Sequence, residues 1–328
     1  MPQIIGIIER IRGFLWIAIL VLAGTIAYSL YRVLLPLPAD PGGHITRVVS
    51  YDEWSPPDAS TIPENTAGDL IRYGRELIVH TARYLGPQGT VSQISNGLNC
   101  QNCHLNAGTK TFAANYSAVA STYPKFRARS GTIEGLEKRV NDCIERSLNG
   151  KPLVADSREM RAIIAYLKWL GKDVPPGQKP DGAGLRELAL LDRAADPGKG
   201  RVHFAKHCAS CHGEDGQGVR AANRVEWLYP PLWGPNSYNT GAGLYRISKF
   251  AAFIKANMPF GVTFLTPQLS DSEAWDIAAF VNSMPRPHRE FPNDWPDLSK
   301  KPIDHPFGPY ADGLSEEAHK YGPFPHKQ

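Results

Sequence analysis

Apolar residues recur with helical spacing along most of the chain. The clearest stripe contains Met160, Ile163 and Leu167, which share one side of a helix because they lie three or four positions apart. The segment Asp156-Ser-Arg-Glu159 precedes this stripe, and the similar segment Ser270-Asp-Ser-Glu273 precedes a second amphipathic stretch. Both segments have the pattern of a capping box, which favours the start of a helix. The pattern predicts an all-α fold.

The two amphipathic helices close two modules that share one order of parts. Each module opens with a helix-compatible segment, at 67–84 and at 201–207, and then carries Cys-x-x-Cys-His. The histidines of these motifs, His104 and His212, are 108 residues apart, and the closing helices are offset by 114 residues. Modules of nearly equal length predict an internal repeat. We therefore expect two consecutive helical domains of the class I cytochrome c type.

The N-terminus contains a long apolar stretch from Phe14 to about Leu35, preceded by Arg10 and Arg12. Basic residues before an apolar segment indicate export, with the basic end left in the cytoplasm. The stretch is long enough to remain as an anchor in the inner membrane, and Ala39 is the best site for its removal as a signal peptide. Under both interpretations the remaining chain lies in the periplasm.

Proline and glycine concentrate between the modules and near the ends of the chain. The linker after the first module has one apolar stretch, at 185–191, that suggests a short helix, whereas the C-terminal residues have no helical period. We predict an anchor or signal segment at 1–38, a tether at 39–63, a first domain at 64–172, a linker at 173–200, a second domain at 201–286 and a loop-rich wrapping tail at 287–328.

Composition limits the classes of partner. The 328 residues carry a net charge of +4, and no run rich in lysine and arginine is present. This argues against a nucleic-acid-binding protein and is compatible with a small anionic substrate. Hydrophobic residues make up 42% of the chain, enough for packed cores.

Four of the five cysteines lie in Cys100-Gln-Asn-Cys103-His104 and Cys208-Ala-Ser-Cys211-His212. Two thiols at this spacing add to the vinyl groups of one heme, and the adjacent histidine becomes a ligand of the iron. A zinc site would not need a histidine directly after each second cysteine, and a dithiol oxidoreductase would have a strand before the motif. We expect two covalently bound hemes c.

The second module offers Met258 as the other iron ligand, because it stands 12 residues before the capping Ser270. Such ligands usually precede the last helix of a small cytochrome. Met284 is the alternative, but it falls at the end of the closing helix in a packing position. Thioether ligation would raise the potential of this heme.

The first module has no methionine at the matching place. Cys143 occupies it, 13 residues before Asp156, and we expect its sulfur to bind the iron of the first heme. Met160 is the alternative ligand, although its spacing is that of a core residue. His80 is expected to be a surface or packing residue. The other interpretation of Cys143 is an inert buried thiol.

Residues 136–147 read as a helix, on which Arg139, Cys143 and Ser147 share one face. A cation one turn away lowers the pKa of a thiol and favours the thiolate. Arg127 and Arg129 lie upstream and would add positive charge near the heme. Thiolate ligation lowers the potential of the first heme, so electrons would pass from it to the second.

The chain resembles the periplasmic diheme thiosulfate dehydrogenases. The resemblance rests on residues 141–150 (NDCIERSLNG) and 257–261 (NMPFG), and less specifically on the tail stretches 306–312 and 321–324. It implies an enzyme that joins two thiosulfate ions into tetrathionate and passes two electrons to an acceptor c-type cytochrome or another periplasmic carrier.

Position by position, the resemblance makes His104 and Cys143 the ligands of the active-site heme. Met258 would be a ligand of the exit heme, and Arg129 and Ser147 would be substrate contacts. A second family arginine would fall on Glu134, so Arg139 or Arg127 takes its role in our interpretation.

The hypothesis is that arginines gather two dianions while the Cys143 sulfur acts as a nucleophile. Three rival functions are a non-enzymatic diheme electron carrier, a tetrathionate reductase and a diheme peroxidase. The carrier predicts His/Met ligation at both hemes, and the peroxidase needs an open or His-ligated heme.

Overall fold

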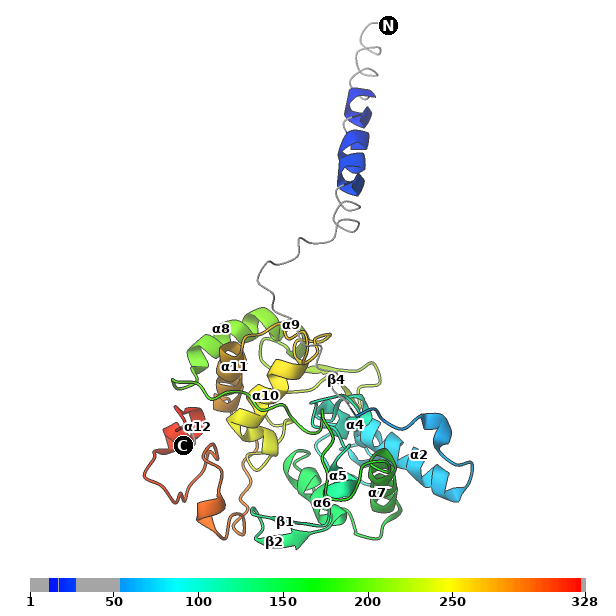
Figure 1. The fold of residues 1–328 in the computed structure, drawn as a ribbon, viewed down its shortest axis with the longest axis vertical. Helices are drawn as coiled ribbons and strands as arrows, with labels where there is room; N and C mark the ends of the chain where they lie inside the picture. The colour runs from blue at the N-terminus through cyan, green and yellow to red at the C-terminus, as the bar shows by residue number, and fades with distance from the viewer. Residues whose placement is uncertain (1–11, 17, 28–53, 326–328) are drawn as a thin grey trace, which may run out of the picture. The chain divides into compact units, whose positions relative to one another are not determined.

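A computed structural model describes residues 12–16, 18–27 and 54–325, and Figure 1 shows it as a ribbon. The chain divides into two compact units, residues 1–50 and 51–328. In the first unit, residues 12–16 and 18–27 are helical. Within the described ranges no helix has the length and apolarity needed to cross a membrane. The rest of the predicted anchor or signal at 1–38, and residues 39–53 of the predicted tether, lie outside the described residues.

The first module is built mainly of helices, with one small β-hairpin. Its two long helices, α2 (Thr66–Val79) and α7 (Arg158–Leu170), pack against each other. The remaining elements are η1 (Ala59–Thr61), α3 (Thr81–Leu85), η2 (Cys100–Asn102), α4 (Leu105–Gly108), α5 (Val119–Thr122), β1 (Lys125–Arg127), β2 (Thr132–Glu134) and α6 (Leu136–Arg146).

A glycine allows α2 and α7 to approach closely. A Cβ atom added at Gly74 would lie 2.0 Å from the carbonyl oxygen of Ala162, well inside van der Waals contact. Around this crossing, Leu77, Tyr166 and Leu170 are buried in one apolar cluster. Packing of the amphipathic faces, more than local helix propensity, therefore fixes these two helices.

The second module repeats this plan. Its opening helix α8 (Pro197–His207) packs against its closing helix α11 (Asp271–Ser283). The elements between them are α9 (Ala209–His212), the antiparallel pair β3 (Val219–Arg220) and β4 (Trp227–Tyr229), η3 (Gly243–Tyr245) and α10 (Ile247–Asn257).

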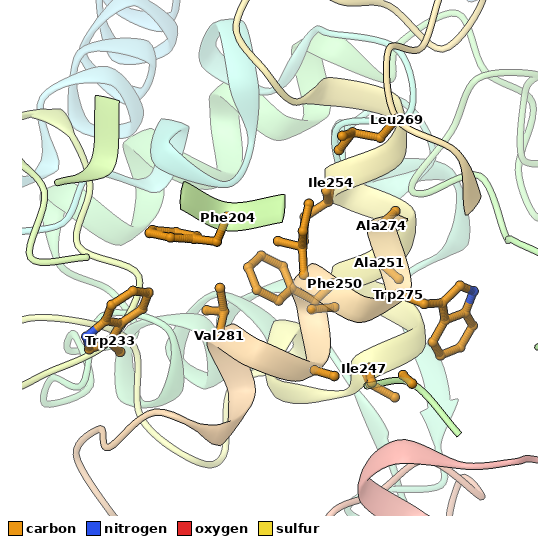
Figure 2. Close-up of a cluster of buried hydrophobic side chains, with 14 of the residues drawn as sticks. Phe204, Trp233, Ile247, Phe250, Ala251, Ile254, Leu269, Ala274, Trp275 and Val281 are labelled. Atoms are coloured by element: carbon orange, nitrogen blue, oxygen red, sulfur yellow. The ribbon is translucent and has the colours of Figure 1, made fainter. Parts of the chain in front are cut away.

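The close approach of α8 and α11 again occurs at a glycine. A Cβ atom at Gly200 would lie 1.8 Å from the carbonyl oxygen of Asp276. Figure 2 shows the core beside this crossing, with Phe204 and Phe250 among its side chains. Both modules therefore have a close helix crossing at a glycine, Gly74 or Gly200, and this similarity supports the repeat that the sequence predicted.

The second module and the tail both contact the first module. Trp227 is buried in a cluster with Leu98, Ile144 and Leu148 of the first module. In the tail, Arg289 donates hydrogen bonds to the carbonyl oxygen of Gly150, at 2.7 Å, and to that of Glu145. These contacts surround α6, so the wrapping tail helps to hold the helix that carries Cys143.

The structure corrects several predicted elements. The fold is mostly helical but not all-α, because it contains the two short strand pairs. No helix forms at 185–191; Leu188, Leu190 and Leu191 instead pack against the second core in irregular backbone. The tail contains η4 (Leu298–Lys300) and the short helix α12 (Glu316–Tyr321), although no period was visible there.

Helix boundaries also shift by a few residues. The opening helix of the second module starts at Pro197, four residues earlier than predicted, and is capped by Asp196. The predicted helix at 67–84 is divided at His80 into α2 and α3. The N-cap of α7 is Ser157 and not Asp156, whereas the Ser270 capping box of α11 is confirmed.

Candidate active site

The first module contains a cavity of about 510 Å³ between its cysteine motif and helix α6. Its lining includes Cys100, Cys103 and His104 of the motif, Cys143 of α6 and Ser147, the C-cap residue of α6. Branched aliphatic side chains form much of the remaining wall: Ile78, Leu85, Leu98, Val119, Val140, Ile144, Leu148, Ile163 and Leu167. An apolar cavity with thiols and an imidazole is chemically suited to a heme group.

His104 is held in one orientation by two neighbours. Its Nδ1 lies 2.5 Å from the carbonyl oxygen of Ala114, and since a carbonyl can only accept, Nδ1 carries the proton. The ring also stacks on Tyr116, with centroids 4.5 Å apart. This arrangement leaves Nε2 unprotonated, as expected for a histidine that binds a metal.

Cys100 is the first residue of the turn η2 and Cys103 follows its end; reciprocal hydrogen bonds between Asn99 and Asn102 fix this turn. Burial raises the pKa of the Cys100 thiol to about 11 and that of Cys103 to about 12. Both are therefore neutral thiols at pH 7. This suits the formation of thioether bonds to a heme, and neither cysteine is a reactive thiolate.

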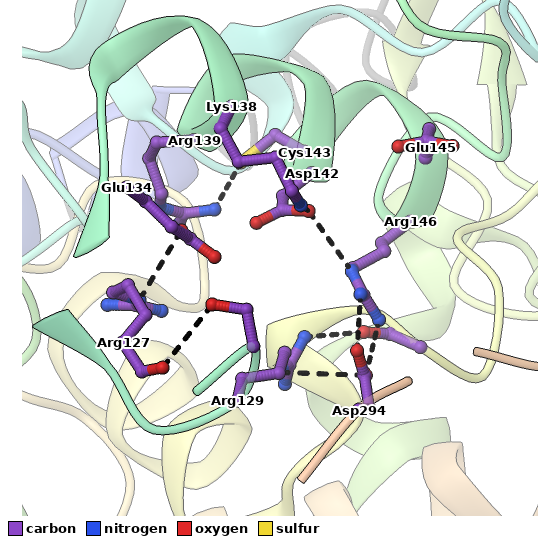
Figure 3. A network of polar contacts seen from close by, with 12 residues as sticks. Arg127, Arg129, Glu134, Lys138, Arg139, Asp142, Cys143, Glu145, Arg146 and Asp294 are labelled. Carbon is purple, nitrogen blue, oxygen red and sulfur yellow. Dashed lines mark hydrogen bonds and ion pairs between the residues drawn. The ribbon is translucent and has the colours of Figure 1, made fainter. Parts of the chain in front are cut away.

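Cys143 has a different environment. Arg139, one turn earlier on α6, donates a hydrogen bond from Nη1 to Cys143 Sγ over 3.1 Å, and Figure 3 shows this contact. Burial raises the pKa of the Cys143 thiol, but the Arg139 guanidinium and the His104 imidazole outweigh it and lower this pKa to about 7. His104 and Cys143, the two predicted ligands of the first heme, therefore line one cavity and interact within it.

Positive charge surrounds the same cavity. Besides Arg139, its lining includes Lys125 and Arg127 of β1, Lys179 of the linker and Lys249 of α10. Among the described lining residues the single carboxylate is Glu187, which forms an ion pair with Lys249 at 3.0 Å. The excess of cations favours a small anion in this cavity.

Arg129 lies outside the lining of the cavity. Its guanidinium donates to the carbonyl oxygen of Gly241 at 3.1 Å, lies 3.9 Å from an Asp294 oxygen and packs over the Trp295 ring. Burial lowers the pKa of Arg129 to about 10. Asp294 is itself held by two hydrogen bonds from Arg146, at 2.7 and 2.8 Å. In this structure Arg129 therefore joins the first module to the tail (Figure 3).

Glu134 is buried at the end of β2, with an oxygen 4.0 Å from Nε of Arg127. It pairs with Lys125 across the hairpin, and its Oε2 has no hydrogen-bond partner. A carboxylate therefore stands where the family resemblance would place an arginine, and Lys125 and Arg127 lie beside it.

The second cysteine motif has the same histidine geometry. His212 Nδ1 lies 2.9 Å from the carbonyl oxygen of Pro230, which again leaves Nε2 free. Met258 follows α10 directly, and both Met258 and Cys208 pack against the core of this module. Met284 contacts the same core from the end of α11, so both candidate methionines are partly buried against this core.

The alternatives in the first module lie elsewhere. Met160 is fully buried and is not among the residues lining the cavity. His80 Nδ1 donates a hydrogen bond to the Glu226 carboxylate of the second module over 2.7 Å, so His80 has a packing role between modules.

Two matched sites, each with two thiols and an oriented imidazole, define a diheme cytochrome of the c type. The comparisons with known proteins agree. The family described as "SoxA/TsdA, cytochrome c domain" matches residues 91–175, and the family "Cytochrome c" matches residues 198–285.

Similar proteins narrow the class to one family. The thiosulfate dehydrogenase of Stutzerimonas stutzeri (strain A1501) is 38% identical over 234 residues, which cover 71% of this chain and 73% of that protein. The thiosulfate dehydrogenase of Allochromatium vinosum is 40% identical over 235 residues, which cover 70% of this chain and 83% of that protein. The chain belongs to the thiosulfate dehydrogenase family and carries two c-type hemes.

A solved structure is similar as well. The "as isolated" form of thiosulfate dehydrogenase (TsdBA) from Marichromatium purpuratum matches with a TM-score of 0.65 and 32% identity. The match covers 70% of this chain and 49% of that longer chain.

Sequence reasoning did not identify three of the cavity's lysines. Lys125, Lys179 and Lys249 come from a hairpin, the linker and the second module. Lys125 was close enough to Arg127 to be suspected from local charge. Lys179 and Lys249 carried no signal, because only the tertiary fold brings them to the cavity.

Proposed function

We propose that the protein oxidises thiosulfate, joining two thiosulfate ions into tetrathionate and passing two electrons to an acceptor c-type cytochrome. One observation carries this proposal: Cys143, with Arg139 on its sulfur, faces His104 in a cavity lined by cations. A simple electron carrier has no need of a thiolate and an anion-binding cavity beside its heme.

His104 and Cys143 would hold the first heme iron, and His212 and Met258 would hold the second. Bound at these sites, the hemes supply two one-electron acceptors for the two electrons that the new sulfur–sulfur bond releases. Nδ1 of each histidine stays protonated toward a carbonyl, which keeps Nε2 directed at the iron site.

The cations of the cavity would reduce the repulsion between two thiosulfate dianions. Two dianions 4 Å apart repel each other by about 4 kcal/mol even in water, and by more in a cavity that excludes water. Lys125, Arg127 and Lys249 line the same cavity as Cys143. They would offset this repulsion and hold both ions near one sulfur atom.

Arg139 would keep Cys143 in the thiolate form. An anionic sulfur is the nucleophilic and ligating form of cysteine, and Ser147, one turn further on α6, lines the same cavity. Its hydroxyl would donate to a bound thiosulfate oxygen. Arg129 would act through the tail contacts that fix the neighbouring backbone, since its guanidinium is already held by Gly241 and Asp294.

The test is the replacement of Cys143 by Gly or Ala. Both variants should keep two hemes, measured as iron per chain and by heme absorbance, and should lose thiosulfate-dependent reduction of an acceptor cytochrome. Electron spin resonance should also lose the thiolate-type signal of the first heme. The matched control is Met160→Leu, which should retain turnover and spectrum. Wild-type turnover in Cys143→Ala would refute the proposal.

We further propose a periplasmic location, with the N-terminal apolar segment directing export, because heme attachment to such motifs belongs to exported chains. Fractionation of cells producing the full chain tests this. Heme-stained protein recovered only in the cytoplasm would contradict it, and its distribution between soluble and membrane fractions reports on inner-membrane anchoring.

A further inference from the structure

A group of metal-binding side chains lies in the second module, outside the heme sites. His203 and His207 of α8 and Glu273 of α11 each offer one ligand atom, and these atoms all lie within 4.8 Å of one another. We propose that these three residues form a binding site for one divalent transition-metal ion of the Zn²⁺ class.

The helices place these ligands without strain. His203 and His207 are four residues apart on α8 and therefore share one face. Glu273 lies in the first turn of α11, and α8 and α11 are packed against each other, as Figure 1 shows. Each ligand thus comes from a rigid element, which limits the loss of side-chain freedom on binding.

Glu273 is fixed before any ion binds. One oxygen, Oε2, accepts hydrogen bonds from the backbone N–H of Ser270 at 2.7 Å and from its hydroxyl at 2.8 Å. The other oxygen, Oε1, lies 3.4 Å from Nδ1 of His203. The capping box therefore directs one carboxylate oxygen at the imidazole pair and holds it there.

The surroundings suit an ion that exchanges with solvent. The side chains of His203 and Glu273 are each 28% exposed, so an ion can reach them. The side-chain amide nitrogen of Gln268 lies 3.5 Å from Nδ1 of His207.

Ligand chemistry selects the class of metal. Two imidazoles and one carboxylate suit Zn²⁺, Ni²⁺ or Cu²⁺ and not Mg²⁺ or Ca²⁺, which prefer oxygen. Water would complete the four ligands of Zn²⁺. An ion here would join the first and last helices of the second module, next to Cys208, and would stabilise that module without taking part in thiosulfate chemistry.

The rival interpretation is an ordinary half-buried histidine–carboxylate pair. A metal site and such a pair differ in the amount of zinc that the protein binds. The full-length holoprotein, treated with a chelator, is dialysed against Zn²⁺ alone, and zinc and iron are measured together by mass spectrometry. Since the two hemes provide an internal iron standard, a specific site gives one zinc for every two irons.

Three variants and a control complete the experiment. His203→Ala and His207→Ala should weaken Zn²⁺ binding by about 10-fold or more, since even the loss of an outer partner of a metal ligand costs about that much. Glu273→Gln should weaken it as well while keeping the capping box, because glutamine serves in the same role. His288→Ala removes an exposed histidine and should bind Zn²⁺ like the wild type.

Stability provides a second readout. Zn²⁺ should raise the melting temperature of the wild type and of His288→Ala, and should not raise that of His203→Ala or Glu273→Gln. In the absence of Zn²⁺, a melting temperature equal to that of the wild type shows that each variant has folded. Binding by the wild type no tighter than that of a His203→Ala/His207→Ala double variant would overturn the proposal, whatever the outcome of the thiosulfate assays.

Discussion

Arg139 Nη1 donates a hydrogen bond to Cys143 Sγ over 3.1 Å, from one turn earlier on α6. A guanidinium is charged at every physiological pH, so this contact favours an anionic sulfur throughout the working range. The pair is the local reason why Cys143 differs from the other cysteines in its module, whose pKa values are raised by burial.

Arg139→Gln should lower turnover about 100-fold, the typical cost of removing one donor that stabilises charge in an active site. Arg139→Lys should keep part of the activity, because it restores the charge without the planar fork. Turnover at saturating thiosulfate and the spin-resonance signal of the first heme measure the effect. Arg161→Gln, an exposed arginine on α7, is the control. Equal activity of Arg139→Gln and Arg161→Gln would exclude the role given to Arg139.

Lys249→Gln should raise KM for thiosulfate several-fold and leave kcat nearly unchanged. Lys249 reaches the cavity from the second module, so it would attract the anion without contacting Cys143. The same variant should weaken the dependence of KM on salt, since screened charges steer less. Lys199→Gln, which changes an exposed lysine of α8, should leave both quantities unaltered. A fall in kcat with constant KM would contradict a recruiting role.

Met258→Ala should lower the potential of the second heme and remove the long-wavelength absorption of a methionine-ligated ferric heme, because thioether ligation raises the potential. Met284→Leu should preserve both properties. Potentiometric titration of the Met258→Ala and Met284→Leu holoproteins measures the potential of the second heme in each. A potential lowered only in Met284→Leu would assign the ligand to Met284.

Glu226 links acid stability to the contact between modules. Burial raises the pKa of Glu226, but hydrogen bonds from His80 and Asn223 outweigh it, so the pKa lies below its usual value. The carboxylate therefore stabilises the folded protein above its unfolded pKa of about 4.3, and this stability is lost as the pH falls through the lower folded pKa.

Glu226→Gln should reduce the free energy of unfolding at pH 7 by about 1–3 kcal/mol. The difference from the wild type should shrink below about pH 4, where the wild-type carboxyl also becomes neutral. Thermal unfolding followed at pH 7 and pH 3 measures this. A constant difference across that range would rule out ionisation as the cause.

Gly74→Ala should destabilise the first module by about 1–3 kcal/mol, the usual cost of overpacking. The added methyl group would meet the carbonyl oxygen of Ala162 at 2.0 Å, and backbone on α7 must shift to relieve it. Gly313→Ala is matched as a control, since nothing lies within 4 Å of its added atom. Calorimetry measures the melting temperatures of Gly74→Ala and Gly313→Ala. Equal melting temperatures would refute the packing argument.

The sequence predicted the features that depend on local spacing. The two cysteine motifs follow from residue order, and the alignment of the repeats led to Cys143 and to helix 136–147, which the structure forms as Leu136–Arg146. The contact of Arg139 with Cys143 was likewise predictable, because a helix brings residues four apart together.

Features set by tertiary packing were not predictable. Residues 185–191 look helical, but Leu188, Leu190 and Leu191 are drawn into the second core in irregular backbone. The environment of Arg129 depends on Asp294, far away in the tail. Lys249 reaches the cavity only because the modules pack together, and no sequence period encodes that.

The bidentate pair between Arg146 of α6 and Asp294 of the tail has a consequence for biosynthesis. Residue 294 is synthesised after both heme motifs, so the helix that carries Cys143 receives this support only after both motifs have been made. A chain shortened before that residue would acquire both hemes and still lack a fixed cysteine. Maturation of the cofactors and maturation of activity are thus separable events in this architecture.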